Sequence, residues 1–408
     1  MNISAVKPAT SANVLFAILL SLSLSATGQP ALASDFDAWL GALRDEAAGK
    51  GISASTLDTA LQGLRPIPRV IELDRQQPEF TQTFWNYLGQ RVTEDRIARG
   101  RKLLEEHRDL LAKVEKQYGV PPRFLVAFWG LETNFGSYLG AFPVVGSLAT
   151  LAHDHRRDAF FRAQLLDALH ILDEGSVTVA DMKGSWAGAV GHMQFMPSTF
   201  LQYAIDATGD GKRDLWGSLP DAFSSAANYL NRLGWRSDEI WGREVKLPKD
   251  FLWDQADLSI KKPIAEWAKM GVRKPDGGPL PKADVAGAIV LPQGYQGPAF
   301  LVYRNFDVIM NWNRSINYAV TVGYLADRFV GLPRIRHGRD ADNRPLSREQ
   351  ALALQSKLNE LGYPVGTPDG IPGAQTRTAI RAFQRDAGLP QDGYPSVSML
   401  EKLNERRS

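Results

Sequence analysis

The chain has 408 residues, of which 44% are hydrophobic, and this length allows about two or three domains with a substantial core, so global disorder is excluded. Its 47 Lys and Arg residues nearly balance its 45 Asp and Glu residues, which excludes the concentrated basic surface of nucleic-acid-binding proteins. The absence of cysteine excludes disulfides, thiolate nucleophiles, cysteine-ligated zinc and lipid attachment through cysteine.

The first 33 residues have the pattern of a cleaved secretory signal. Lys7 precedes the apolar run 14–24, and the Ala-Leu-Ala sequence at 31–33 matches a signal-peptidase site. The alternative is an uncleaved membrane anchor, but the run is shorter than the roughly 20 apolar residues that a spanning helix needs. We therefore expect a periplasmic or secreted protein with no membrane anchor after cleavage, and, without cysteine, not a lipoprotein.

The mature chain is predicted to be mainly helical in its first part. From 36 to 118, apolar residues recur every three or four positions, which is typical of amphipathic helices. A second helical stretch is predicted from 121 to 233. Between 245 and 303 the sequence is rich in Pro and Gly and contains short β-type runs, which predicts a small β-containing insertion.

The pattern changes twice more toward the C-terminus. A helical pattern resumes from 306 to 329, and the polar, Arg-rich residues 333–345 indicate a linker. Residues 346–408 then form a separate compact unit. The sequence thus predicts one large region over 34–332 and a small second domain.

One carboxylate has an unusual predicted setting. A helix is predicted from 121 to 135, with prolines in its first turn and Gly136 as its stop, so Glu132 lies in its last turn. The helix dipole there disfavours an ionised carboxylate, and the neighbours Phe128 and Phe135 are apolar. A protonated Glu can act as the general acid in glycosidic cleavage. The commoner fate of a lone Glu is an ion pair with an arginine, and spacing alone leaves both open.

Several motifs that follow one another along the chain favour a catalytic role for Glu132 over an ion pair. They are FWGLETNFG at 128–136, GSWAGAVGHMQFMPST at 184–199, and AANYL at 226–230 followed by Gly-Trp at 234–235. Together they resemble the lytic murein transglycosylases of the membrane-bound B family. The resemblance covers about 36–332 and implies a lysozyme-like catalytic region with a single catalytic glutamate, which in this chain is Glu132.

The second motif predicts contacts with a saccharide. Its glycines would let the backbone approach a ligand closely, although Gly188 and Gly191 fit turns and close helix packing equally well. The resemblance implies substrate contacts from Ser185 and Gln194. Trp186 could stack on a pyranose ring, whereas aromatic side chains in helical proteins more often lie in the core.

A later motif adds two more expected substrate contacts. The sequence NWNRSINY at 311–318 resembles the late active-site helix of the family, in which an Asn and a Tyr face the cleft near the catalytic Glu. These correspond to Asn313 and Tyr318. Trp312 stands where some relatives have Tyr.

The resemblance implies a reaction with one carboxylate. The other candidate acids, Asp154, Asp158 and Asp181, have no comparable apolar setting. The family's reaction cleaves the β-1,4 bond between MurNAc and GlcNAc in peptidoglycan and gives a 1,6-anhydromuramoyl product. The alternatives are a hydrolytic muramidase, which admits water, and a non-catalytic peptidoglycan-binding scaffold.

A further segment, 206–217, partly matches a calcium-binding loop. Oxygen side chains stand at positions one, three, five and nine with Gly at six, as in an EF-hand, but position twelve is Gly217 instead of Glu. The alternative is a polar turn between helices. No cofactor is required for the expected reaction, and a Ca²⁺ ion would be structural. Its ligands would be Asp206, Thr208, Asp210, the backbone carbonyl of Lys212, and Asp221.

The C-terminal unit is predicted to be a three-helix module. Its Asp-Gly-x-x-Gly-x-x-Thr sequence and the later Phe-Gln resemble the peptidoglycan-binding module found beside many wall hydrolases. Asp369, Gly373 and Thr376 are expected to be structural. The expected partners are peptidoglycan glycan strands, with cell-wall synthesis proteins as further candidates and no nucleic acid. The fold class is therefore mainly α, with a lysozyme-like region and a small β-containing insertion.

Overall fold

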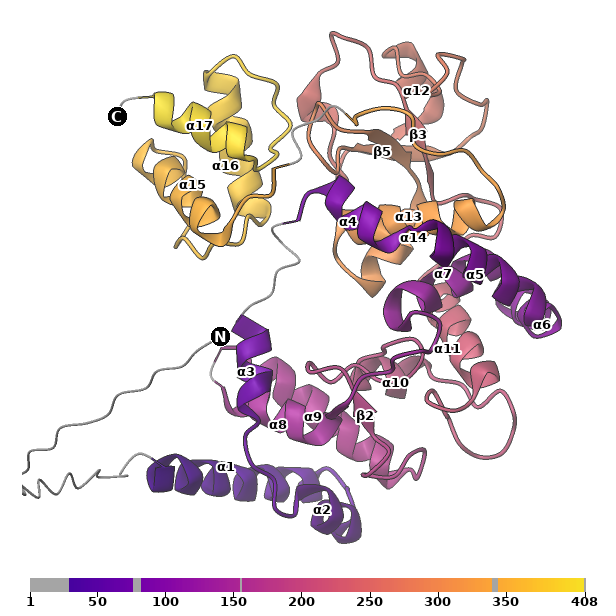
Figure 1. The fold of residues 1–408 in the computed structure, drawn as a ribbon, viewed down its shortest axis with the longest axis vertical. Helices are drawn as coiled ribbons and strands as arrows, with labels where there is room; N and C mark the ends of the chain where they lie inside the picture. The colour runs from indigo at the N-terminus through magenta and orange to yellow at the C-terminus, as the bar shows by residue number, and fades with distance from the viewer. Residues whose placement is uncertain (1–28, 76–81, 155, 340–343, 407–408) are drawn as a thin grey trace, which may run out of the picture.

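The computed structural model describes residues 29–75, 82–154, 156–339 and 344–406 (Figure 1). The predicted signal therefore lies almost wholly outside the described residues. Within the described ranges, no helix combines the length and the apolar character needed to cross a membrane.

The first part of the chain is helical, as predicted. Its helices are α1 (Gln29–Gly49), α2 (Ala54–Leu61), α3 (Pro68–Arg75), α4 (Phe84–Arg91), α5 (Glu94–Glu106) and α6 (Arg108–Tyr118). Threonines are the N-caps of α4 and α5. Thr83 accepts a hydrogen bond from the Asn86 N–H, and Thr93 accepts one from the Arg96 N–H. Gly119 ends α6 in the left-handed conformation.

The second helical stretch surrounds one buried helix. Its elements are α7 (Pro122–Thr133), β1 (Phe142–Pro143), α8 (Val144–His153), α9 (Asp158–Asp173), β2 (Lys183–Gly184), α10 (Pro197–Tyr203) and α11 (Leu219–Arg232). Helix α7 is buried over residues 124–130, and it packs against α5, α6, α11 and the later helix α14 (Ile316–Phe329). Strands β1 and β2 pair antiparallel. The buried helix therefore has little freedom to move its C-terminal residues.

The predicted β-containing insertion is a four-stranded antiparallel sheet with its own core. Its strands are β3 (Gly242–Val245), β4 (Lys262–Pro263), β5 (Ala286–Val290) and β6 (Ala299–Val302), in the order β3-β6-β5-β4. A 3₁₀ turn, η2 (Trp253–Gln255), and helix α12 (Ile264–Lys269) cover it. Trp267 is fully buried and donates from Nε1 to the Gly287 carbonyl at 2.8 Å, which joins α12 to β5.

Two helices return the chain to the larger helical region after the sheet. They are α13 (Arg304–Trp312) and α14. Part of the segment after α14, where the sequence indicates a linker, is bound to the sheet. The Glu244 carboxylate accepts hydrogen bonds from the backbone N–H groups of Arg336 and His337.

The C-terminal module consists of three helices, as predicted. They are α15 (Arg348–Glu360), α16 (Ala374–Asp386) and α17 (Val397–Glu405). Buried Gln355 donates to Asp369 Oδ1 and Thr376 Oγ1 and accepts from the Gly370 N–H, so these polar residues hold the loop between α15 and α16. The mainly α fold class is thus confirmed.

The elements occupy distinct parts of the molecule. Figure 1 shows α1, α2, α3, α8 and α9 at one end and the four-stranded sheet at the other, with α10 and α11 between them. The C-terminal module lies beside the sheet. Helix α7 lies near the middle, where it contacts α5 and α6 from the first part of the chain, α11, and α14, which follows the sheet in sequence.

Candidate active site

The predicted catalytic residue, Glu132, is half-buried in the last turn of α7. The helix ends at Thr133, two residues earlier than predicted. Asn134 and Phe135 take left-handed backbone angles, with φ of 49° and 59°, before Gly136 with φ of 74°. An Asn tolerates this conformation, whereas for a Phe it costs about 1–2 kcal/mol. The chain thus turns sharply directly after Glu132.

The strain is concentrated at the predicted site. Among the described residues, the only non-glycine residues with a left-handed backbone are Asn134, Phe135 and Gln194. Two follow Glu132, and the third lies in the second sequence motif. Such strain persists only where the surrounding structure holds it, and it clusters at functional sites.

Hydrogen bonds fasten the end of α7 to the second motif. Thr133 Oγ1 donates to the His192 carbonyl at 3.0 Å, and Trp129 Nε1 donates to His192 Nδ1 at 3.0 Å. Burial lowers the pKa of His192, while the charge of Asp214 opposes this, so the imidazole is neutral at neutral pH and accepts from Trp129. Glu132 and Thr133, at the end of α7, are therefore tied to the motif at 184–199.

A tyrosine from a distant helix contacts the glutamate. Tyr318, in the first turn of α14, donates its hydroxyl hydrogen bond to Glu132 Oε1. Burial raises the pKa of Tyr318 well above its ordinary value, and the nearby Glu132 raises it further. The hydroxyl therefore stays protonated and acts as a donor to the carboxyl group. The structure thus places Tyr318 against Glu132.

Aromatic rings form a wall beside this pair. Trp312 stacks on Phe128 with ring centroids 4.2 Å apart, and it contacts Phe195 and Tyr229, each at 5.3 Å. Tyr203 packs on Tyr229 at 4.7 Å. Burial raises the pKa of Tyr229 to about 12, so it is an uncharged part of this wall.

Sequence reasoning missed the role of Tyr229. Its hydroxyl donates to the Asn311 carbonyl at 3.1 Å, which ties α11 to the end of α13. The motif at 226–230 contained the signal, because its Tyr lies shortly before a Gly-Trp pair on an otherwise small-residue helix face. Only the contact with Trp312 reveals that the two helices share one wall.

The second motif supports its own loop with two of the predicted substrate residues. Gln194 donates from Nε2 to the carbonyls of Leu139 and Gly191, at 3.1 and 3.0 Å. Ser185 Oγ accepts the Ala189 N–H at 3.0 Å and closes a tight turn. Both side chains are half-buried and hold backbone.

The remaining predicted substrate residues lie at the edges of helices or of the core. Trp186 is half-buried and packs against the main core. Asn313 is half-buried and follows α13 as its C-cap, shortly before Tyr318 in the chain. By contrast, the predicted residues Glu132 and Tyr318 are joined by a direct hydrogen bond.

The other candidate acids have partners elsewhere. Asp154 pairs with Arg75 at 3.6 Å, Asp158 accepts the Ala159 N–H at 2.7 Å, and Asp181 accepts the Thr178 hydroxyl at 2.6 Å. Each of these acids thereby has a structural contact, and none of these contacts involves Glu132.

The predicted cation loop is held together by its own hydrogen bonds. Asp206 accepts the N–H groups of Gly209 and Gly211, at 2.7 and 2.8 Å. Asp221 is fully buried and accepts the N–H groups of Ala207 and Asp214, each at 2.9 Å. In the described part of the chain, no group of three or more His, Asp and Glu side chains is arranged to hold a metal ion. The hydrogen bonds of Asp206 and Asp221 thus hold the backbone of this turn.

Residues 29–339 form a mainly helical region in which the buried helix α7 ends with Glu132 and which also contains the antiparallel strand pair β1–β2, and this fold is of the lysozyme-like class. Residues 35–327 match the family described as Transglycosylase SLT domain, and the chain belongs to that family. Residues 347–403 match the family described as Putative peptidoglycan binding domain.

Individual relatives agree with this assignment. The chain is 32% identical over 251 residues to membrane-bound lytic murein transglycosylase B of Escherichia coli, covering 60% of this chain and 66% of that protein. It is 47% identical to SltB3 of Pseudomonas aeruginosa, solved with NAG-anhNAM-pentapeptide, with a TM-score of 0.87 over 90% of this chain and 99% of SltB3. Slt35 of E. coli, solved with calcium, has a TM-score of 0.62 at 27% identity, over 71% and 92% of the two chains.

Proposed function

We propose that the protein is a secreted lytic transglycosylase that cleaves the β-1,4 bond between MurNAc and GlcNAc in peptidoglycan and leaves a 1,6-anhydromuramoyl end. Glu132 serves as the single acid and base. The observation that carries the proposal is the hydrogen bond from Tyr318 to Glu132, in a chain that belongs to the Transglycosylase SLT domain family. The similar protein SltB3 was solved in complex with an anhydro sugar, NAG-anhNAM-pentapeptide, and this supports the same reaction.

In the first step, Glu132 acts as the general acid. Its carboxyl proton passes to the glycosidic oxygen as the bond from that oxygen to the muramic C1 breaks. The N-acetyl oxygen of the same muramic acid attacks C1, and a positively charged oxazolinium ring forms. Glu132 is left as a carboxylate, and the hydrogen bond from Tyr318 stabilises that charge.

In the second step, the same carboxylate acts as the base. It removes the proton of the muramic C6 hydroxyl while O6 attacks C1, and the bond from C1 to the N-acetyl oxygen breaks. The product is the 1,6-anhydro sugar, and Glu132 is again protonated. The atoms balance without water, so one carboxyl group and the substrate's own groups are sufficient.

The proposed substrate contacts follow the predicted set. Trp186 stacks on a sugar ring, and Asn313, Ser185 and Gln194 bind hydroxyl or N-acetyl groups. Gln194 and Ser185 act partly through backbone, because their side chains hold the loop that carries them.

We further propose that residues 1–33 direct the protein to the periplasm or outside the cell, where its substrate is. The larger region, 34–332, then carries the reaction. The module over 346–408 binds peptidoglycan and raises the local concentration of glycan strands around the catalytic region. No lipid anchor attached through cysteine can do this, because the chain has no cysteine.

Analysis of the reaction products tests the proposal. The protein is incubated with purified peptidoglycan, and the soluble fragments are examined by mass spectrometry. Anhydromuramoyl ends support the proposal, and reducing muramic ends identify a muramidase instead. Binding without release of any fragment identifies a non-catalytic scaffold.

A further inference from the structure

The C-terminal module is held against the sheet of the larger region by specific contacts. Arg381 on α16 forms an ion pair with Asp257 at 2.8 Å, and both side chains are about 30% exposed. The Tyr295 N–H donates to Asp392 Oδ2 at 2.8 Å. Gly294 fits beneath the module because it has no Cβ, which would lie 2.7 Å from the Asp392 carboxylate. The two parts therefore meet at a defined junction.

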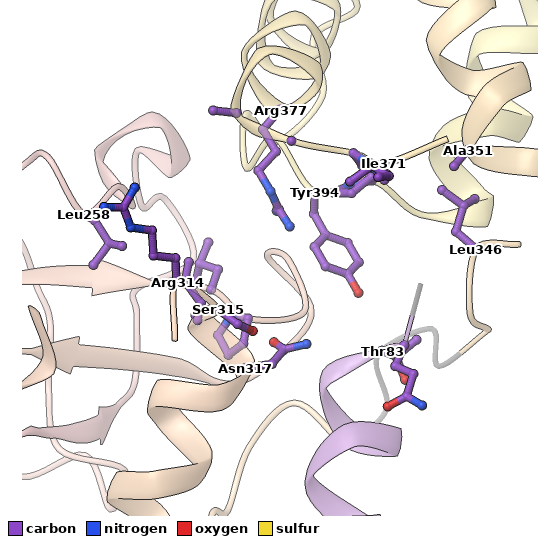
Figure 2. A pocket seen from close by; sticks show the side chains of 18 of the residues that line it. Thr83, Leu258, Arg314, Ser315, Asn317, Leu346, Ala351, Ile371, Arg377 and Tyr394 are labelled. Carbon is purple, nitrogen blue, oxygen red and sulfur yellow. The ribbon is translucent and has the colours of Figure 1, made fainter. Parts of the chain in front are cut away.

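A cavity of about 350 Å³ lies at this junction, and we call it the junction pocket. The larger region lines it with Leu258, Met310 and the segment 314–317, and the module lines it with Ile371, Arg377 and Tyr394, among others. Figure 2 shows Arg377 and Tyr394 extending from the module into the space that Arg314, Ser315 and Asn317 border from the other side. Its volume suits a short peptide segment.

The charges around the junction pocket are of one sign. Three arginines line it, Arg314, Arg344 and Arg377, and its lining residues include no Asp or Glu. Arg344 forms an ion pair with Glu401 at 3.1 Å. Within the described ranges, neither Arg314 nor Arg377 has a carboxylate within ion-pair distance. The half-buried Arg377 and the exposed Arg314 thus border one cavity in which an anion would offset their charge.

Desolvation makes an anion more favourable at Arg377. Burial lowers the pKa of Arg377, and the neighbouring Arg381 lowers it further, although Tyr394 and Asp392 oppose this. The Asp392 carboxylate is already engaged, because it accepts from Gln384 Nε2 at 2.7 Å and from two backbone N–H groups. A ligand carboxylate could form the bidentate pair for which a guanidinium is shaped.

The junction pocket borders the start of α14, the helix that carries Tyr318. Ser315 caps α14 by accepting the Tyr318 N–H at 3.3 Å, and Tyr318 contacts Glu132. Arg314 also lies near the aromatic wall, since its charge partly opposes the rise in the pKa of Tyr229. A substrate with its sugar beside Glu132 could therefore reach the junction pocket with a substituent of that sugar.

We propose that the junction pocket binds a carboxylate of the peptide stem that peptidoglycan carries on its muramic acid, with Arg314 and Arg377 as its ligands. This inference rests on the proposed function, because it concerns the substrate of the same site. Leu258, Met310 and Ile371 pack against the aliphatic side chains of the stem. The catalytic region and the module thus share one substrate, and the peptide sets which strands are cleaved fastest.

Steady-state kinetics on two substrates test this inference in the full chain. One substrate is glycan strands that bear peptide stems, and the other is the same strands after enzymatic removal of the peptides. Arg377→Ala and Arg314→Gln are each expected to raise KM on the peptide-bearing strands about 10-fold or more, with kcat nearly unchanged, because each removes a charge-assisted hydrogen bond. On stripped strands their effect is expected to stay within about twofold. Arg385→Ala is the matched control, since this exposed arginine lies on the same helix outside the junction pocket.

A binding measurement separates this inference from the proposed reaction. Calorimetry with the free stem pentapeptide is expected to show binding to the parent chain, weaker binding to Arg377→Ala, and loss of binding when the peptide carboxylates are amidated. These results do not depend on catalysis. Equal losses on both kinetic substrates would assign the arginines to the glycan itself and overturn the inference, as would unchanged KM with no peptide binding. Failure of the reaction would instead appear as the absence of anhydro products from either substrate.

Discussion

Tyr318 donates a hydrogen bond to the carboxyl group of Glu132 across a sequence separation of 186 residues. The donor lies in the first turn of α14 and the acceptor in the last turn of α7, and these two helices pack against each other. The contact thus depends on the packing of α14 against α7.

Replacement of Tyr318 tests the value of this contact. Tyr318→Phe is expected to lower kcat by about 10- to 100-fold, because the Glu132 carboxylate loses the donor that stabilises its charge after proton transfer. The rate of release of soluble fragments measures this. Tyr363→Phe is the control, since it removes a similar hydroxyl-to-carboxylate hydrogen bond, to Asp386 at 2.9 Å, within the module. Equal rates for Tyr318→Phe and the parent would show that the contact has no catalytic role.

The buried Asp327 predicts a pH dependence of stability. Burial raises its pKa from 3.8 to about 6, although the hydrogen bond from Trp241 Nε1 and the charge of Arg123 oppose the rise. A carboxyl whose pKa is raised by folding stabilises the fold fully below its unfolded pKa, and this contribution is lost as the pH rises through its folded pKa. The parent should therefore lose about 1–3 kcal/mol of unfolding free energy from this group between about pH 4 and pH 7.

Asp327→Asn isolates that contribution. The variant should be more stable than the parent at about pH 7 and lose the advantage toward about pH 4, as measured by urea unfolding at several pH values. Asp45→Asn, at an exposed position, is the control and should follow the parent. A constant difference between Asp327→Asn and the parent at all pH values would contradict the assignment.

Two glycines with similar backbone angles predict different costs. Gly191 has φ of 68°, and a Cβ there would lie 2.4 Å from the Leu215 carbonyl oxygen. Gly209 has φ of 74° and open space around it. Gly209→Ala should cost about 1 kcal/mol from the backbone angle alone, and Gly191→Ala about 3 kcal/mol or more. Thermal unfolding measures both, and equal costs would show that the loop at 191 can yield.

The loop from Asp206 to Asp221 predicts insensitivity to chelators. Because its acidic side chains accept backbone N–H groups, EDTA should leave both the melting temperature and the activity unchanged. Asp221→Asn should lower stability by about 1–3 kcal/mol with or without added Ca²⁺, since one of the two N–H groups bound by this buried carboxylate loses its acceptor. A chelator-induced fall in melting temperature that Ca²⁺ reverses would instead show that the loop rearranges around a metal.

Local patterns are sufficient to predict most of the fold. Helical periodicity and the Pro-Gly-rich region correctly indicate the helical parts, the β-containing insertion and the three-helix module. Strand β3 escapes prediction, because its four residues, Gly-Arg-Glu-Val, have no alternation and become a strand only by pairing with β6. The predicted end of α7 is too late, since Asn134 and Phe135 leave the helix through contacts that the second motif supplies.

The candidate site also contains residues that the local sequence indicates and residues that it does not. Glu132 stands out by its place in a helix, whereas Tyr318 is indicated only through a resemblance, because an aromatic residue on an apolar helix face looks like core. The wall formed by Trp312, Tyr229 and Phe195 combines three separate segments, so no local pattern could reveal it. The junction pocket depends on how the module docks, and the sequence contains no local signal for that docking.

The most direct test of the account is mass spectrometry of the fragments that the parent and Glu132→Gln release from purified peptidoglycan. Both proteins are first shown to have the same melting temperature. The parent should release fragments with 1,6-anhydromuramoyl ends, and Glu132→Gln should release them at least about 1,000-fold more slowly, because an amide can neither give nor take the proton. Fragments with reducing muramic ends, or an undiminished rate in Glu132→Gln, would contradict the account.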